Sequence, residues 1–155
     1  MFKEVMVIKV VLQRVSEAEV VVNGQVISHI GRGYLVLLGV AASDTEVQVE
    51  AIINKIAKLR IFPDENGKSN LSIADIDGEV MIVSQFTLYA DTSKGNRPGF
   101  IEAAPPELAK TLYEYSIEFG KGKFRKVASG SFGADMKVRL VNDGPFTIAM
   151  ETPSV

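Results

Sequence analysis

Four consecutive residues near the middle of the chain carry groups that could take part in chemistry: Ser84, Gln85, Phe86 and Thr87. The two hydroxyls could act as nucleophiles or hold a substrate, and the amide can both donate and accept hydrogen bonds. The preceding residues 80–83 (Val-Met-Ile-Val) form a continuous apolar run, which predicts a strand buried on both faces of a sheet. A strand holds side chains rigidly, so the pattern predicts a site at its end. In the alternative interpretation, the hydroxyls satisfy backbone groups and Phe86 belongs to the core.

A base that could activate either hydroxyl is not evident. The only histidine, His29, lies beside Ile27 in a predicted hairpin strand, where a surface or edge position is expected. Nothing in the sequence links it to a Ser-His-Asp arrangement. The absence of cysteine excludes thiolate nucleophiles and disulfides, and a single histidine does not fit the usual zinc or iron sites. No metal site and no phosphate-binding glycine loop is therefore expected.

Two further segments have the composition of functional loops. Residues 90–100 contain glycine and proline and carry two cations, Lys94 and Arg97, which could be solvated or could contact phosphate. Residues 142–145 (Asn-Asp-Gly-Pro) predict a sharp turn, and the Gly144–Pro145 bond could take either isomer.

The elements that must position these residues alternate between strand and helix patterns. Apolar runs predict strands at 9–15, 20–27, 34–40 and 80–83, with Asn23-Gly24 as a type I′ hairpin turn. Helical spacing predicts helices at 44–60 and from 105 to Gly120. Ser43 is the expected N-cap of the first helix, with Glu46 completing a capping box.

At the C-terminal end, residues 136–140 and 146–150 predict two strands joined by the 142–145 turn, with the second strand returning after it. A length of 155 residues suits a single domain, residues 1–155, of the α/β class. Residues 1–7 extend the first strand or form a tail. The net charge is −2, and no segment has the pattern of a membrane span or a signal peptide, so a cytoplasmic protein is expected.

Three motifs resemble those of the D-aminoacyl-tRNA deacylase family: residues 84–88 (Ser-Gln-Phe-Thr-Leu), 94–98 (Lys-Gly-Asn-Arg-Pro) and 142–147 (Asn-Asp-Gly-Pro-Phe-Thr). Residues 12–15, 54–62 and 132–136 support the resemblance, which extends from about Lys9 to Thr152. A related branch acts on L-alanine attached to the wrong tRNA and has a Pro-Gln-Ala-Thr motif, so the first motif favours the D-specific branch.

The resemblance implies a barrel-like mixed sheet packed with two main helices. It implies a homodimer that needs no cofactor and has its active sites at the subunit interface. The reaction would be hydrolysis of the ester between a D-amino acid, or glycine, and the 3′-terminal adenosine of tRNA, which keeps D-residues out of translation. The preferred amino acid and tRNA stay open. Family members usually begin near Ile8, so residues 1–7 would be an extension.

The resemblance also implies roles for residues. Gly144 and Pro145 would present backbone carbonyls to the substrate's α-amino group and reject L-side chains, braced by Arg14. Backbone N–H groups near Phe86 and Thr87 would stabilise the oxyanion.

In that scheme Gln85 would orient the site, and Lys94 and Arg97 would contact tRNA phosphates. The ribose 2′-hydroxyl of the substrate would help activate water. Thr87 as a covalent nucleophile is the competing mechanism, although it would need a base. Gly99 stands where serine is common in the family, so no role is assigned to it.

Two other functions fit the same residues. A non-catalytic RNA-binding module would bind tRNA with strong salt dependence and without turnover. A small-molecule hydrolase using Ser84 or Thr87 would cleave simple esters, with a pH dependence set by His29.

Overall fold

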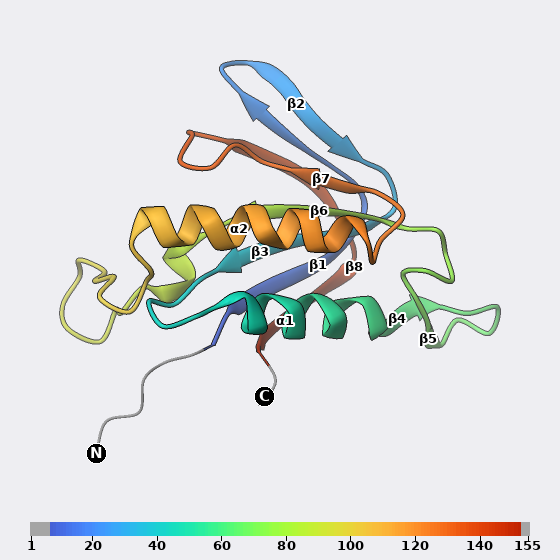
Figure 1. Cartoon of the computed structure of the whole chain (residues 1–155). Helices are drawn as coiled ribbons and strands as arrows, with labels where there is room; N and C mark the ends of the chain where they lie inside the picture. Colours follow the sequence, from blue (N-terminus) through green and yellow to red (C-terminus); the bar gives the residue numbers. More distant parts are fainter. Residues whose placement is uncertain (1–6, 153–155) are drawn as a thin grey trace.

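The computed structural model describes residues 7–152, so the expected extension of residues 1–7 lies outside the described residues except for Val7. Two helices lie along one side of a strongly twisted mixed sheet (Figure 1). The elements in chain order are β1 (Lys9–Val22), β2 (Gln25–Ile30), β3 (Gly33–Gly39), α1 (Glu46–Lys58), β4 (Arg60–Pro63), β5 (Ser69–Ser72), β6 (Glu79–Ser84), the 3₁₀ helix η1 (Phe86–Tyr89), α2 (Pro106–Lys121), β7 (Val127–Ser129) and β8 (Lys137–Glu151).

The main sheet has the order β2-β1-β3-β6-β7, and β8 pairs with β1. β1 is antiparallel to β2, β3 and β8, whereas β3, β6 and β7 run parallel. The two ends of this order approach one another, because the Ser28 hydroxyl of β2 donates to the Ser129 carbonyl of β7 at 2.7 Å. The sheet is therefore a nearly closed barrel packed with two main helices, which confirms the predicted fold class.

The central strands are buried on both faces, as the apolar runs predict. Tyr34, Val36 and Leu38 of β3 belong to the core beneath α1 and α2. Leu35 and Met81 face the other way, into a second core inside the curved sheet. This double covering explains why β3 and β6 have almost no polar residues before their C-terminal ends.

The predicted hairpin is confirmed, because Asn23 and Gly24 both have positive φ angles, 51° and 77°. The predicted helix start is wrong. The N-cap of α1 is Thr45, and Gln48 completes the capping box, while the carboxylate of Asp44 accepts a hydrogen bond from a residue before the helix. α2 ends one residue beyond the predicted Gly120, at Lys121.

The chain does not return after the turn at 142–145. β8 is one long strand that continues along β1, from Lys137 opposite Val21 to Glu151 opposite Lys9. Register shifts on β1 around Val15 show where the turn bulges out of the ladder.

Candidate functional site

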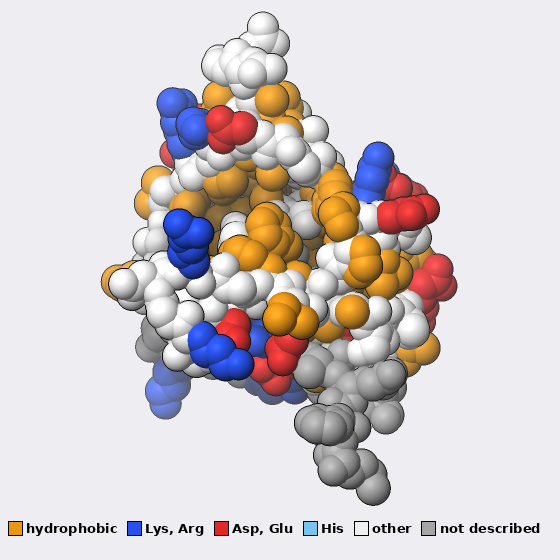
Figure 2. All heavy atoms as spheres, turned by 90° about the vertical axis from the view of Figure 1, so that its left-hand side faces the viewer, with side chains coloured by type: hydrophobic (Ala, Val, Ile, Leu, Met, Phe, Trp, Pro, Cys, Tyr) orange, Lys and Arg blue, Asp and Glu red, His pale blue; other side chains and the backbone are white. Residues whose placement is uncertain are grey.

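A largely apolar pocket of about 750 Å³ opens at the C-terminal end of β6. Figure 2 shows this end of the molecule, where hydrophobic side chains gather around a hollow with charged side chains at its rim. Three separate segments form the lining with Ala109 and Val138: residues 83–86, residues 100 and 103–106, and residues 132–136.

Three residues of the predicted chemical motif, Ser84, Gln85 and Phe86, line this pocket, and the strand before them ends one residue later than predicted. Ser84 is the last residue of β6, and Phe86 and Thr87 lie in η1. Phe86 is 54% exposed, so the interpretation that it belongs to the core is wrong. The Gln85 side-chain amide donates to the Thr87 hydroxyl, while the Gln85 backbone N–H donates to the Leu38 carbonyl at 2.8 Å.

The start of η1 provides hydrogen-bond donors beside the pocket. The first N–H groups of a helical turn have no partner within it. Among the hydrogen bonds of the described residues, none uses the backbone N–H of Phe86 or Thr87. Two such donors side by side can stabilise a negatively charged oxygen.

Aromatic rings and a buried tyrosine shape the pocket walls. Phe86 and Phe100 meet edge to face with ring centroids 5.0 Å apart. Outside the lining, the buried Tyr113 hydroxyl donates to the Ile82 carbonyl at 2.7 Å and accepts from the Gly130 N–H at 3.0 Å. Tyr113 therefore fixes the start of the loop that carries residues 132–136.

The second motif forms a protruding turn with a cis Gly144–Pro145 peptide bond. Arg14 contacts this turn: its Nε donates to the Asp143 carbonyl at 3.0 Å, and its guanidinium lies 4.5 Å from the Phe146 ring centroid. Gly144 has φ +145°, and a Cβ there would lie 2.9 Å from the Phe146 nitrogen, so the position requires glycine.

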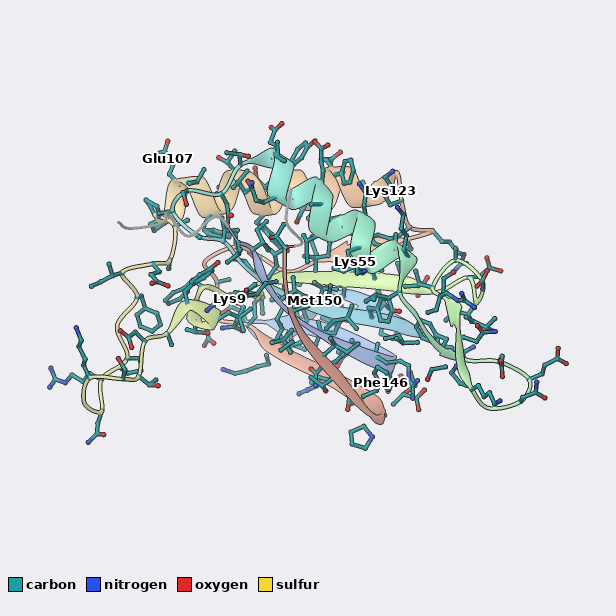
Figure 3. The ribbon with its side chains drawn as sticks, turned by 90° about the horizontal axis from the view of Figure 1, so that it is seen from below. Lys9, Lys55, Glu107, Lys123, Phe146 and Met150 are labelled. Atoms are coloured by element: carbon teal, nitrogen blue, oxygen red, sulfur yellow. The ribbon has the colours of Figure 1, made fainter. Side chains whose placement is uncertain are left out.

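The two motifs lie at opposite ends of the sheet within one chain. Asn142 of β8 lies opposite Val15 of β1, and Val15 lies opposite Gly33 of β3. Gly33 in turn lies opposite Glu79, at the start of β6. Ser84 stands at the other end of β6, five residues further, or roughly 17 Å along the strand. Figure 3 shows the same separation, with Phe146 and Lys9 toward opposite ends of the sheet. One chain does not bring the predicted residues together.

The remaining candidate residues do not line this pocket. Lys94 and Arg97 are exposed in the loop between η1 and α2, which a bridge between Asp91 and Gly99 closes. His29 pairs with Glu19 in the β1–β2 hairpin and has an exposed side chain. No hydrogen bond of the described residues connects it to the motif.

Neither metal nor membrane features appear in residues 7–152. No group of three or more His, Cys, Asp or Glu side chains in this range could hold a metal ion. Neither α1 nor α2 combines the length and the hydropathy of a membrane-spanning helix.

Sequence reasoning missed one wall of the pocket. Ala103 to Pro106 line it because Ala103 forms a bridge to Ala41 after β3, a contact 62 residues away in the chain. Small residues followed by a proline pair carry no signal for a binding wall. The resemblance itself already included the opposite wall, residues 132–136.

Known proteins resemble this chain over nearly its whole length. The sequence model of the family described as D-Tyr-tRNA(Tyr) deacylase matches residues 11–151. The chain is 51% identical to the D-aminoacyl-tRNA deacylase of Thermosipho melanesiensis, covering 95% of this chain and 99% of that protein. It is 53% identical to that of Magnetococcus marinus, with coverages of 94% and 97%.

Solved structures share the fold. A structure titled "c-Myc DNA Unwinding Element Binding Protein" has a TM-score of 0.89 and 44% identity, covering 94% of this chain and 99% of the other. A second, titled as a probable eukaryotic D-amino acid tRNA deacylase, has a TM-score of 0.83 at 19% identity, covering 94% of this chain and all of the other.

Proposed function

The chain belongs to the D-Tyr-tRNA(Tyr) deacylase family and is an ester hydrolase of the D-aminoacyl-tRNA deacylase class; from this premise we propose how and where it acts. The substrate ester is cleaved in the pocket at the end of β6. The observation that carries this proposal is the pair of backbone N–H groups at Phe86, which lines the pocket, and at the next residue, Thr87. Neither group has a hydrogen-bond partner among the described residues.

The pocket accommodates the 3′-terminal adenosine, and its ester lies over η1. The size of the pocket and the exposed Phe86 ring against Phe100 support this placement, because bases stack well on aromatic side chains. Water attacks the ester carbonyl carbon, the two N–H groups stabilise the oxyanion, and the bond to the ribose 3′-oxygen breaks. The proton passes to that oxygen.

The protein supplies no base in this mechanism, and the ribose 2′-hydroxyl of the substrate helps activate the water. The contacts of Thr87 support this choice. Its hydroxyl accepts a hydrogen bond from Gln85, and no carboxylate or imidazole of the described residues is bonded to it. Thr87 therefore positions the substrate, and Gln85 orients Thr87.

Selectivity comes from the turn of a second subunit. Gly144 and Pro145 present backbone carbonyls to the α-amino group, and an L-side chain collides with the turn. Arg14 braces it through the Asp143 carbonyl. The separation of the two motifs within one chain supports a homodimer, since only a partner's turn could reach this pocket. Glycyl-tRNA, whose amino acid has no side chain to collide, is also accepted.

Lys94 and Arg97 contact the tRNA backbone. They stand on the exposed loop that leads from η1 to Phe100, a residue of the pocket lining. A tRNA substrate is met in the cytoplasm. Alanine at either position should raise KM, and the effect should shrink as salt concentration increases.

The test compares purified protein on D-Tyr-tRNA, L-Tyr-tRNA and Gly-tRNA in the presence of a chelator. We expect rapid release from the D-form and from glycyl-tRNA, with the L-form spared. Binding without release from any of the three would instead indicate an RNA-binding module. Equal release from the D- and L-forms would exclude the selective turn.

A further inference from the structure

Residues 38–41, which include the end of β3 and the two residues after it, connect both sides of the pocket. On the motif side, the Leu38 carbonyl accepts from the Gln85 N–H at 2.8 Å. Gly39 packs so closely that a Cβ there would lie 3.0 Å from the Gln85 carbonyl oxygen and 3.1 Å from the Leu88 Cβ. Any shift of this segment would therefore move the start of η1.

The same segment holds the opposite wall. The Ala104 N–H donates to the Val40 carbonyl at 2.9 Å, and Ala41 forms a β-bridge with Ala103. Ala103 and Ala104 both line the pocket. The position of this wall thus depends on where the backbone of Val40 and Ala41 lies.

A buried carboxylate fixes that backbone. Asp44 is only 3% exposed, and its Oδ2 accepts from the Ala41 N–H at 2.6 Å, while its own N–H donates to the Ala41 carbonyl at 3.1 Å. Its Oδ1 has no hydrogen-bond partner among residues 7–152. The helix does not need Asp44, because Thr45 is the N-cap of α1.

Keeping an ionised carboxylate here opposes folding. Burial raises the pKa of Asp44 to about 6, and the hydrogen bond from the Ala41 N–H counteracts part of that rise. A neutral side chain would satisfy the same N–H without desolvating a charge. Costly ionisable groups beside a pocket are candidates for a functional role.

We propose that Asp44 is a positioning residue for deacylation: its ionised carboxylate holds Ala41, and through Ala41 it holds the Ala103–Ala104 wall against the terminal adenosine. This inference rests on the proposed function of the pocket. Asp44 does not touch the substrate. Its charge strengthens the hydrogen bond that sets the width of the site.

Within the part of the chain that the structure describes, few charged groups surround Asp44. Tyr89 of η1 interacts with it electrostatically and is also influenced by Glu102 and Glu151, two exposed carboxylates. Lys9 of β1 lies 4.7 Å from the Tyr89 ring centroid. Burial is the dominant influence on Asp44 itself, so its protonation is the expected event near pH 6.

Protonation has opposite effects on the site and on the fold. A raised carboxyl pKa means that the folded protein binds this proton more tightly than the unfolded chain does. Asp44 alone therefore makes the fold more stable as pH falls from 7.5 toward 5. Over the same range the hydrogen bond to Ala41 loses its charge assistance, so the wall loosens and KM rises.

The experiment measures kcat and KM for D-Tyr-tRNA between pH 5 and 7.5 with the wild-type protein, Asp44→Asn and Asp64→Asn. Asp64 is the matched control. Its carboxylate also accepts from backbone N–H groups, those of Asn66 and Lys68, but in the loop between β4 and β5. That loop lies at the far side of the molecule from the pocket (Figure 1).

At pH 7.5, Asp44→Asn should raise KM roughly fivefold to tenfold with kcat nearly unchanged, the size expected when a charge-assisted hydrogen bond becomes a neutral one. The wild-type KM should approach that of the variant near pH 5, and Asp64→Asn should follow the wild type throughout. The substrate's own amino group titrates in this range. The ratio of KM between each variant and the wild type at the same pH is therefore the quantity to compare.

A second measurement needs no variant. In wild-type protein, the NMR amide shifts of Ala41, Ala103 and Ala104 should titrate with one midpoint near pH 6. Unchanged KM in Asp44→Asn at every pH, or an Ala41 shift that Ala103 and Ala104 do not follow, would overturn the inference. Wild-type protein that releases no amino acid from any tRNA would instead contradict the proposed function.

Discussion

At the scale of single residues, the site offers backbone donors where a conventional hydrolase would offer a base. The Thr87 hydroxyl accepts a hydrogen bond from Gln85, and His29 lies in the β1–β2 hairpin, whereas Thr87 lies in η1. A hydroxyl without a base is a weak nucleophile, whereas fixed N–H groups stabilise an oxyanion without one. In the proposed mechanism, the chemistry therefore depends on the backbone conformation of η1 more than on any one side chain.

Thr87→Ala separates the two mechanisms. If Thr87 only positions the ester, losing its hydroxyl removes a neutral hydrogen bond, and kcat should fall by about tenfold at most. Single-turnover deacylation of D-Tyr-tRNA measures this. Thr111→Ala, which removes an exposed hydroxyl bonded to the Glu107 carbonyl in α2, is the matched control. A loss of more than about a thousandfold would make Thr87 the nucleophile.

Gly144→Ala tests the selective turn. The residue has φ +145° and its new Cβ would lie within 2.9 Å of the Phe146 nitrogen, so the turn must change shape. We expect release from D-Tyr-tRNA to slow and the preference for D- over L-tyrosine to narrow by at least about tenfold. Gly67→Ala, also at positive φ but with open space around it, controls for backbone strain alone. Unaltered discrimination would count against the turn.

At the scale of elements, residue patterns predict the strands and turns whose conformation depends on the burial and backbone angles of those same residues. Continuous apolar runs identify β3 and β6 because both faces of these strands are covered. Asn23-Gly24 identifies the hairpin because its turn needs two positive φ angles. The motif at residues 84–87 marks the pocket because it follows directly on β6.

Side-chain hydrogen bonds to the backbone, together with pairing to distant residues, decide the features that the sequence does not reveal. The N-cap lies at Thr45 instead of Ser43 because Asp44 bonds back to Ala41, whose backbone pairs with Ala103. β8 continues through its turn because Asn142 holds the two halves in line. The pairing of Ala41 with Ala103 and the bond from Asn142 to the Arg14 carbonyl join residues far apart in the chain, so no local pattern of residue types reveals them.

Asn142→Ala tests that explanation. The Asn142 Oδ1 accepts from the Phe146 N–H at 2.9 Å, and its Nδ2 donates to the carbonyls of Phe146 and Arg14. Without these bonds, the free energy of unfolding should fall by about 1–2 kcal/mol, since each net contribution is modest and water replaces part of it. Urea denaturation measures the change, and Asn66→Ala, in the exposed loop between β4 and β5, should leave the midpoint unaltered.

The same variant should lose selectivity as well as stability, because the turn it supports is the one that we propose rejects L-tyrosine. Destabilised protein with intact discrimination would mean that Arg14 alone holds the turn in place. Loss of discrimination without any loss of stability would place the effect in the turn and not in the strand.

At the scale of the whole molecule, the arrangement of the motifs sets the oligomeric requirement. The pocket is at one end of the sheet and the Gly144–Pro145 turn is at the other. Among the described strands, β8 pairs only with β1. The site that we propose then needs two chains, each giving its turn to the other's pocket, as in an isologous dimer.

Mixing two impaired variants tests this proposal directly. One carries Phe86→Ala with Phe100→Ala, which removes the aromatic side of the pocket, and the other carries Gly144→Ala. A mixed dimer contains one site built from an intact pocket and an intact turn. Equal mixing after subunit exchange should therefore restore about a quarter of the wild-type sites, since half the dimers are mixed and each has one good site of two. Each variant mixed with itself is the control. If activity stays at the level of the separate variants although sedimentation shows a dimer, the partner's turn does not complete the pocket, and the proposal of a shared site is wrong.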